Sequence, residues 1–341
     1  MMRGGYDRAA CGCHSGMMKK EKVFIAGPYN EDAKEIMKEE LSKDFELAFI
    51  TRQEDFQEVL DADYVVLRTL KLPGDIISSM PKLKFIQRWG AGVDVIDIET
   101  AGERGIVVAN TADANAPAVA ELTLLLMLSV YRRILEINLA MHRGQWIKNS
   151  IDKKCFMING KKVGIIGAGN IGTLVGKYVQ ALDAKVLYYD KRRLSPEKEA
   201  ELGFEYASFE ELLKSSDIIT LHVPLDDTTK YMIDEEQFAL MKKNAVLINC
   251  ARGGVVNEKA LIKALKEERI LGAGLDCFET EPLPADSPIL ELPNLVLSCH
   301  VGGNTADVAF RLAHRCVENI RAFRTGQLEE KYIKNKKYLK K

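Results

Sequence analysis

The sequence predicts an α/β protein with two doubly wound parallel-sheet domains, and three observations lead to this prediction. Apolar runs of strand length alternate with helical patterns over nearly the whole chain, which is typical of parallel sheets covered by helices. With 341 residues the chain is longer than one ordinary domain. A G-x-G-x-x-G turn, which usually follows the first strand of a doubly wound sheet, begins only at Gly167. A complete α/β unit therefore precedes it.

The chain begins with an extension that we exclude from the fold. The first 16 residues lack both an apolar stretch and a helical period, so they do not form a secretory signal, and we expect residues 1–18 to be disordered. Cys11, Cys13 and His14 are soft metal ligands, but no second ligand pair follows at the spacing of a zinc finger. We predict no metal site.

The first unit contains five expected strands and a helical segment at 31–43. Its strands are predicted at 22–27, 46–50, 64–68, 83–90 and 105–110. A long helical stretch follows from about Ala118 to His142, with Pro117 near its start, where proline is tolerated. Because this stretch is apolar almost all round, we expect it to be buried between domains or between the subunits of a homodimer.

The second unit repeats the strand and helix alternation. Its strands are predicted at 163–166, 185–190, 218–224, 245–253, 270–278 and 294–300, and a last helical pattern occupies 304–326. The basic segment 331–341 at the C-terminal end is interpreted as a solvated tail.

Composition argues against several classes of partner. Lysine plus arginine number 48 against 49 acidic residues, so no overall field favours nucleic acid or an anionic membrane. The most apolar segment, 122–131, is too short to span a bilayer. Seven scattered cysteines, an odd number, suit a reducing cytosol better than a disulfide framework. We expect a cytoplasmic protein with a small-molecule partner.

The glycine turn predicts a dinucleotide site. Gly167, Gly169 and Gly172 follow an apolar strand and open a helical segment, so backbone can approach a pyrophosphate at a helix N-terminus. Asp190 ends the next strand, where a carboxylate binds ribose hydroxyls and repels a 2′-phosphate. This favours NAD, although the basic residues at 191–193 leave NADP open.

Three later strand ends carry reactive side chains. Arg252, Glu281 and His300 follow successive strands, and the carboxyl ends of parallel strands meet in one crevice. His300 would protonate a carbonyl oxygen, Glu281 would bind the other ring nitrogen, and Arg252 would hold the carboxylate of a 2-oxo acid.

The chain resembles the D-isomer-specific 2-hydroxyacid dehydrogenases over residues 22–325. The resemblance rests on RWGAGVDVID (88–97), VAELTLLLML (119–128), GIIGAGNIG (164–172), LHVPLDDTT (221–229), NCARGGVVNE (249–258), LDCFETEP (275–282) and HVGG (300–303). It implies a Rossmann NAD-binding domain at 116–304 and a flavodoxin-like substrate domain at 19–115 plus 305–341. Cys299 departs from the family pattern, which often has proline there.

The resemblance also implies roles for individual residues. It makes Arg252, Glu281 and His300 catalytic, and it makes the loop Gly90, Ala91, Gly92 and Val93, with Arg252, the binder of the substrate carboxylate. The implied cofactor contacts are Gly167, Gly169, Asn170, Ile171, Gly172, Asp190, Val223, Pro224, Cys250, Ala251, Arg252, Asp276, His300, Gly302 and Gly303.

We therefore predict an NAD-dependent oxidoreductase of small D-2-hydroxy acids, of the glyoxylate, hydroxypyruvate or 3-phosphoglycerate type. Arg88, beside the carboxylate loop, is either a phosphate ligand or a structural residue. The alternative function is an NAD(H)-sensing, protein-binding module like the corepressors that share this fold.

Overall fold

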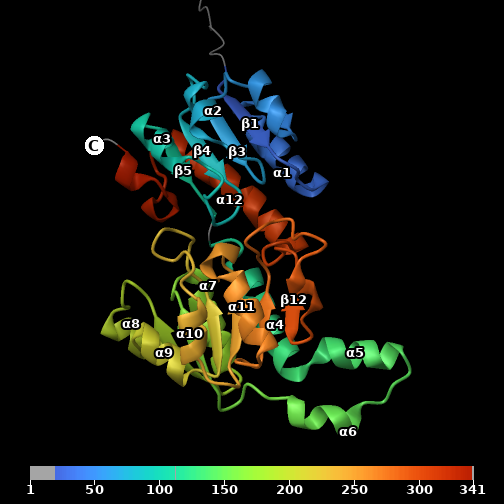
Figure 1. The fold of residues 1–341 in the computed structure, drawn as a ribbon. Helices are drawn as coiled ribbons and strands as arrows, with labels where there is room; N and C mark the ends of the chain where they lie inside the picture. The colour runs from blue at the N-terminus through green and yellow to red at the C-terminus, as the bar shows by residue number, and fades with distance from the viewer. Residues whose placement is uncertain (1–19, 112, 340–341) are drawn as a thin grey trace, which may run out of the picture.

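The computed structural model describes residues 20–111 and 113–339 and divides into two α/β domains, each built on a parallel sheet (Figure 1). The predicted disordered extension at 1–18 and the cysteines and histidine at 11–14 lie outside the described residues. The two sheets confirm the predicted fold class.

The first sheet has five strands in the order β2-β1-β3-β4-β5, and all neighbours are parallel. This is the flavodoxin-like order. The strands are mostly apolar, with Val23, Val65 and Phe85 fully buried. All five strands fall within their predicted ranges: β1 Lys22–Ala26, β2 Glu46–Ile50, β3 Tyr64–Leu67, β4 Phe85–Arg88 and β5 Val107–Ala109.

Helices from both ends of the chain cover this sheet. In α1 (Glu31–Leu41), the side chain of Asn30 caps the first turn by accepting from the Ala33 N–H, and two acidic residues favour the helix N-terminus. The last helix, α12 (Ala306–Arg324), packs on α1 and β4, so the chain returns to the first domain after completing the second (Figure 1). Two short helices complete the domain, α2 (Gly74–Ser78) and α3 (Ile98–Glu103).

The second sheet has seven parallel strands in the order β12-β11-β10-β9-β6-β7-β8, which is the Rossmann order extended by one strand. The two-residue strand β8 was not predicted, because Glu205 and Tyr206 form no apolar run. The strands are β6 Lys162–Ile166, β7 Lys185–Tyr189, β8 Glu205–Tyr206, β9 Ile218–Leu221, β10 Val246–Asn249, β11 Gly272–Leu275 and β12 Leu295–Leu297. Its helices include α7 Asn170–Gln180, α8 Pro196–Leu202, α9 Phe209–Ser215, α10 Glu235–Leu240 and α11 Glu258–Lys266.

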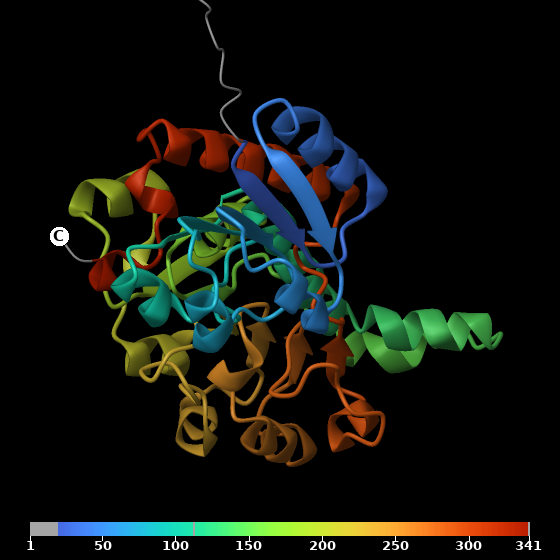
Figure 2. The same cartoon turned by 90° about the horizontal axis from the view of Figure 1, so that it is seen from above.

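The single long helix predicted from Ala118 to His142 is wrong, because two helices occupy this stretch. The first, α4 (Ala116–Arg132), packs on α7 and on β10 to β12. Arg133 then takes a left-handed conformation, with φ 48°, and ends it. The second helix, α5 (Ile134–His142), and the short α6 (Lys148–Ile151) project from the second domain as an arm (Figures 1 and 2). No helix in the described residues is long and apolar enough to cross a membrane.

The prediction of a solvated C-terminal tail is also wrong for its described part, which ends at residue 339. Ile333 pairs antiparallel with Ala109, and the Lys334 N–H donates to the Val108 carbonyl over 2.8 Å. The side chain of Asn335 is fully buried and bonds the Val108 N–H and the Ile106 carbonyl. The segment satisfies backbone groups at the open edge of β5, which a charge count alone does not reveal.

Candidate active site

A cleft lies where the carboxyl ends of both sheets face each other, and it encloses a cavity of about 430 Å³. Residues from the two domains line it together. The predicted site residues on its wall are Gly90, Ala91, Gly92, Ile171, Cys250, Arg252, Asp276, Glu281, His300, Gly302 and Gly303. The remaining predicted residues lie off this wall, mostly at the glycine turn and the strand ends beside it.

The glycine turn connects β6 to α7, and each of its three positions requires or favours glycine for a different physical reason. Gly167 has a φ of +97°, and a Cβ there would lie 2.6 Å from the His222 carbonyl oxygen. A Cβ at Gly172 would lie 2.1 Å from the Gly167 carbonyl oxygen, so glycine lets the helix pack on the turn. Gly169 has neither constraint: nothing lies within 4 Å of its added Cβ. Open space beside an uncapped helix N-terminus fits a bound pyrophosphate.

Asp190 follows β7 and is held against the glycine turn. Its carboxylate accepts from the Ala168 N–H at 2.9 Å and from the Arg192 N–H at 3.0 Å. Of the neighbouring cations, Lys191 bonds Thr228, and Arg193 forms a bidentate pair with Glu199. The basic residues that left NADP open in the sequence are therefore partly committed to other partners.

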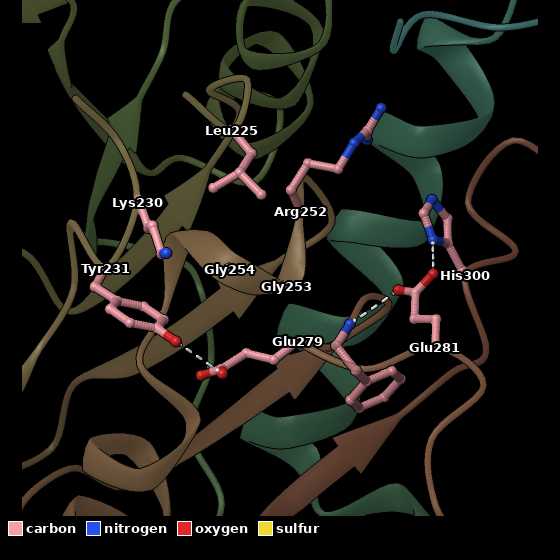
Figure 3. Close-up of a pocket in the computed structure, with 10 residues that line it drawn as sticks. Leu225, Lys230, Tyr231, Arg252, Gly253, Gly254, Glu279, Glu281 and His300 are labelled. Atoms are coloured by element: carbon pink, nitrogen blue, oxygen red, sulfur yellow. Dashed lines mark hydrogen bonds and ion pairs between the residues drawn. The ribbon is translucent and has the colours of Figure 1, made fainter. Parts of the chain in front are cut away.

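His300 and Glu281 form a hydrogen-bonded pair at the end of β12. His300 Nδ1 lies 2.7 Å from Glu281 Oε2, and the other oxygen, Oε1, accepts from the Phe278 N–H at 2.9 Å (Figure 3). Figure 3 shows the second ring nitrogen directed away from Glu281. The Phe278 N–H thus fixes the Glu281 carboxylate, and the carboxylate in turn orients the His300 imidazole.

Asp276, at the end of β11, shapes the loop that carries His300. Its carboxylate accepts from the N–H groups of Val301 and Gly302, at 2.9 and 2.8 Å, and its carbonyl accepts from the His300 N–H. A Cβ at Gly302 would lie 3.0 Å from Asp276 Oδ2. Because Gly302 has no side chain, the buried Asp276 carboxylate can reach the backbone of this loop. This holds His300 in a left-handed conformation, with φ 55°.

Arg252, at the end of β10, reaches across the cleft into the carboxylate loop of the first domain. Its Nε donates to Asp94 Oδ2 at 2.9 Å, and its Nη1 donates to the Ala251 carbonyl at 2.6 Å. A Cβ at Gly92 would lie 1.6 Å from Arg252 Nη2, so the guanidinium occupies the space that a side chain would need. The arginine and the glycine loop therefore form one surface.

Arg88 holds the Gly90–Val93 loop, the predicted binder of the substrate carboxylate, through hydrogen bonds to backbone carbonyls. Its Nε donates to the Gly92 carbonyl at 2.8 Å, and its Nη1 donates to the carbonyls of Leu67 and Arg68. Burial lowers the pKa of Arg88 to about 10. These contacts support the structural interpretation of Arg88 over the phosphate-ligand one.

Several residues on or beside the cavity were missed from the sequence, and Asn115 and Asp94 are two of them. Asn115, just before α4, lines the wall, and its buried Oδ1 has no hydrogen-bond partner. Asp94 lies within a quoted motif, but nothing in the sequence connected it to Arg252. Cys250 also lines the wall, and burial raises the pKa of its thiol to about 12, so it stays protonated at neutral pH.

Comparison with known proteins places this geometry in a family. The sequence model described as "D-isomer specific 2-hydroxyacid dehydrogenase, NAD binding domain" matches residues 124–302. A glyoxylate reductase from Thermococcus litoralis is 42% identical over 80% of this chain and 83% of its own. A D-3-phosphoglycerate dehydrogenase from Methanocaldococcus jannaschii is 41% identical over 92% of this chain, which spans only 59% of that relative's length.

A solved structure agrees with the sequence matches. A D-lactate dehydrogenase from Aquifex aeolicus, complexed with NAD and lactic acid, has a TM-score of 0.82 and 32% identity, covering 91% of this chain and 98% of its own. An acyclic imino acid reductase in complex with NADPH and D-Arg has a TM-score of 0.81 and 28% identity, covering 92% of this chain and 99% of its own. The chain therefore belongs to the D-isomer specific 2-hydroxyacid dehydrogenases and is an NAD-dependent oxidoreductase of that family.

Proposed function

We propose that this chain reduces short, unphosphorylated 2-oxo acids such as glyoxylate and hydroxypyruvate with NADH, and that it catalyses the reverse oxidation. The hydrogen bond of 2.7 Å between His300 Nδ1 and Glu281 carries the proposal, because it places an oriented acid and base on the wall of the cleft. Several relatives bear the names glyoxylate reductase or hydroxypyruvate reductase. These relatives are enzymes, which supports turnover over the corepressor-like sensor.

The chain's own residues account for the proton and the orientation of the substrate. NADH, when bound, supplies the hydride that reduces the carbonyl carbon. His300 donates the proton that the carbonyl oxygen takes up, from the ring nitrogen opposite Glu281, and it accepts that proton in the oxidation. Glu281 stabilises the charged ring, and Arg252 with the N–H groups of the Gly90–Val93 loop binds the carboxylate.

The coenzyme site is proposed at the glycine turn. The open space at Gly169 and the α7 N-terminus would hold the pyrophosphate, and Asp190 would bind the ribose hydroxyls. Asn115 is the further candidate that the structure adds, because its buried amide oxygen lacks a donor beside Gly303. The N–H of a bound carboxamide group is the kind of donor that would bond the Asn115 Oδ1.

Substrate size is argued from Arg88. Its Nε and Nη1 donate to backbone carbonyls, so we propose that Arg88 supports the loop and does not bind a phosphate. The test is a panel of glyoxylate, hydroxypyruvate and 3-phosphohydroxypyruvate, with NADH oxidation followed at 340 nm. We expect the first two to give the higher kcat/KM. A preference for the phosphorylated acid would refute this choice, and no NADH oxidation with any acid would refute the enzymatic proposal.

We further propose a cytoplasmic homodimer that uses the arm. Apolar side chains of α5 and the following turn are about half-exposed or more, including Leu135, Leu139 and Trp146. A second copy would bury them. Light scattering should give the mass of a dimer, and Leu139→Asp should halve it. Phe49→Asp is the control, since Phe49 is also exposed but lies in β2 of the first domain. The cysteines of the described residues are all free, which supports a reducing compartment.

A further inference from the structure

We propose that Asp94 is a positioning residue for the reaction: it holds Arg252 across the domain cleft so that a single guanidinium nitrogen, Nη2, remains to bind the substrate. This inference rests on the proposed role of Arg252 in binding the carboxylate. It goes beyond that role because it states that an acidic residue in the opposite domain sets the orientation of the Arg252 side chain.

The hydrogen bonds of Arg252 carry the first step. Nε donates to Asp94 at 2.9 Å and Nη1 donates to the Ala251 carbonyl at 2.6 Å, so two of the three guanidinium nitrogens already have a hydrogen-bond partner. Nη2 lies against Gly92, where an added Cβ would be 1.6 Å away. Because a guanidinium is planar and rigid, fixing two nitrogens also fixes the direction of the third.

The position of Asp94 in the fold carries the second step. Asp94 belongs to the loop that follows β4 in the first sheet, whereas Arg252 follows β10 in the second. The ion pair therefore joins the two halves of the active site directly. The Asp94 side chain is 46% exposed and that of Arg252 is 29% exposed. Because solvent screens such a pair, it contributes little to the free energy of unfolding. An orienting role is consistent with such a pair.

Charge balance gives the third step. Arg88 lies below the loop and bonds only carbonyl oxygens, so its positive charge has no carboxylate hydrogen-bonded to it. Arg88 repels Arg252, while Asp94 attracts both. Asp94 is thus a shared counter-ion that keeps two arginines near one loop.

The test is a double-mutant cycle of Asp94→Ala and Arg252→Ala, with kcat and KM measured for glyoxylate. If Asp94 acts through Arg252, Asp94→Ala lowers kcat/KM about tenfold or more in the wild-type background, mostly through kcat, and less than twofold when Arg252 is already absent. Asp94→Asn keeps a hydrogen-bond acceptor and should recover part of the loss. Equal effects in both backgrounds, or no loss in Asp94→Ala, would overturn the proposal.

A matched control separates positioning from folding. Asp97 lies three residues further along and caps α3 through the Thr100 N–H and hydroxyl, without contact to Arg252. Asp97→Ala should lower the melting temperature and leave kcat within about twofold; an equal kcat loss there would overturn the Asp94 role. If the wild type turns over no 2-oxo acid, the proposed function fails, and the same cycle is then measured on the dissociation constant of oxalate.

Discussion

Substituting Gly92 by alanine tests whether Arg252 binds the substrate from its observed position against the Gly90–Val93 loop. Gly92 does not have a left-handed φ, so its backbone accepts alanine without strain. The added Cβ would lie 1.6 Å from Arg252 Nη2, 2.8 Å from its Cζ and 2.7 Å from Asp94 Oδ2. The guanidinium would have to retreat by roughly 2 Å to restore an ordinary contact.

The size of the effect follows from this displacement. A retreat of about 2 Å stretches the bond to Asp94 beyond hydrogen-bonding distance and removes Nη2 from the loop. Losing one charge-assisted hydrogen bond to the substrate costs about 1.5–3 kcal/mol, which is about 10- to 150-fold in kcat/KM. The melting temperature should change little, because the site is at the cleft wall and a flexible side chain absorbs the clash.

The assay is steady-state reduction of glyoxylate, with NADH binding followed separately by fluorescence. NADH affinity should be unchanged, because the substitution lies in the substrate domain. Gly254→Ala is the matched control: it lies two residues from Arg252, but the nearest atoms to its added Cβ belong to the flexible Leu225 side chain, at 3.1 Å or more. If Gly92→Ala retains kcat/KM within twofold, Arg252 does not bind substrate from its observed position.

Three other predictions test separate parts of the site. His300→Gln should lower kcat about 10²- to 10⁴-fold while NADH still binds, and retained turnover would rule out His300 as the acid. Asp190→Ala should lower the preference for NADH over NADPH on the order of tenfold in kcat/KM, because the carboxylate that repels the 2′-phosphate is gone; an unchanged ratio contradicts this. Burial lowers the pKa of His222 to about 3, so stability should fall as pH drops from about 6.5 toward 3, where only the unfolded state gains this proton. Unfolding of His222→Asn should depend less on pH in that window.

The strands were predictable because parallel strands buried on both faces are continuous apolar runs. All those of three residues or more lie within the predicted ranges except β6, which begins one residue early at Lys162, whereas β8, with two residues, has no such run. The end of α4 was not predictable for a similar reason. Arg133 is neither glycine nor asparagine, so its left-handed conformation, which separates the arm from the buried helix, has no local sequence signal.

The site was predictable only where chemistry and local sequence coincide. Glycines, a histidine and an arginine at strand ends are visible in a single sequence, and their positions at the edge of a parallel sheet follow from topology. The Arg252–Asp94 pair joins residues 158 apart in different domains, and the burial of Asn335 at the edge of β5 depends on a return of the chain from far away. Such contacts depend on how the two sheets face each other, which strand patterns do not encode.

The two domains contribute different parts of the proposed site, which explains why the site needs a contact between domains such as the Arg252–Asp94 pair. In the proposed mechanism the second domain carries the pair that transfers the proton, His300 and Glu281. The geometry of this pair is fixed locally, since the Asp276 carboxylate accepts from the N–H groups after His300 and the Phe278 N–H donates to Glu281. The first domain contributes the Gly90–Val93 loop, to which we assign the binding of the substrate carboxylate. A 2-oxo acid reacts only when its carboxylate and its carbonyl are held at once. The residue that spans the cleft must therefore be oriented by both domains, and Arg252 is bound on one side by its own strand end and on the other by Asp94.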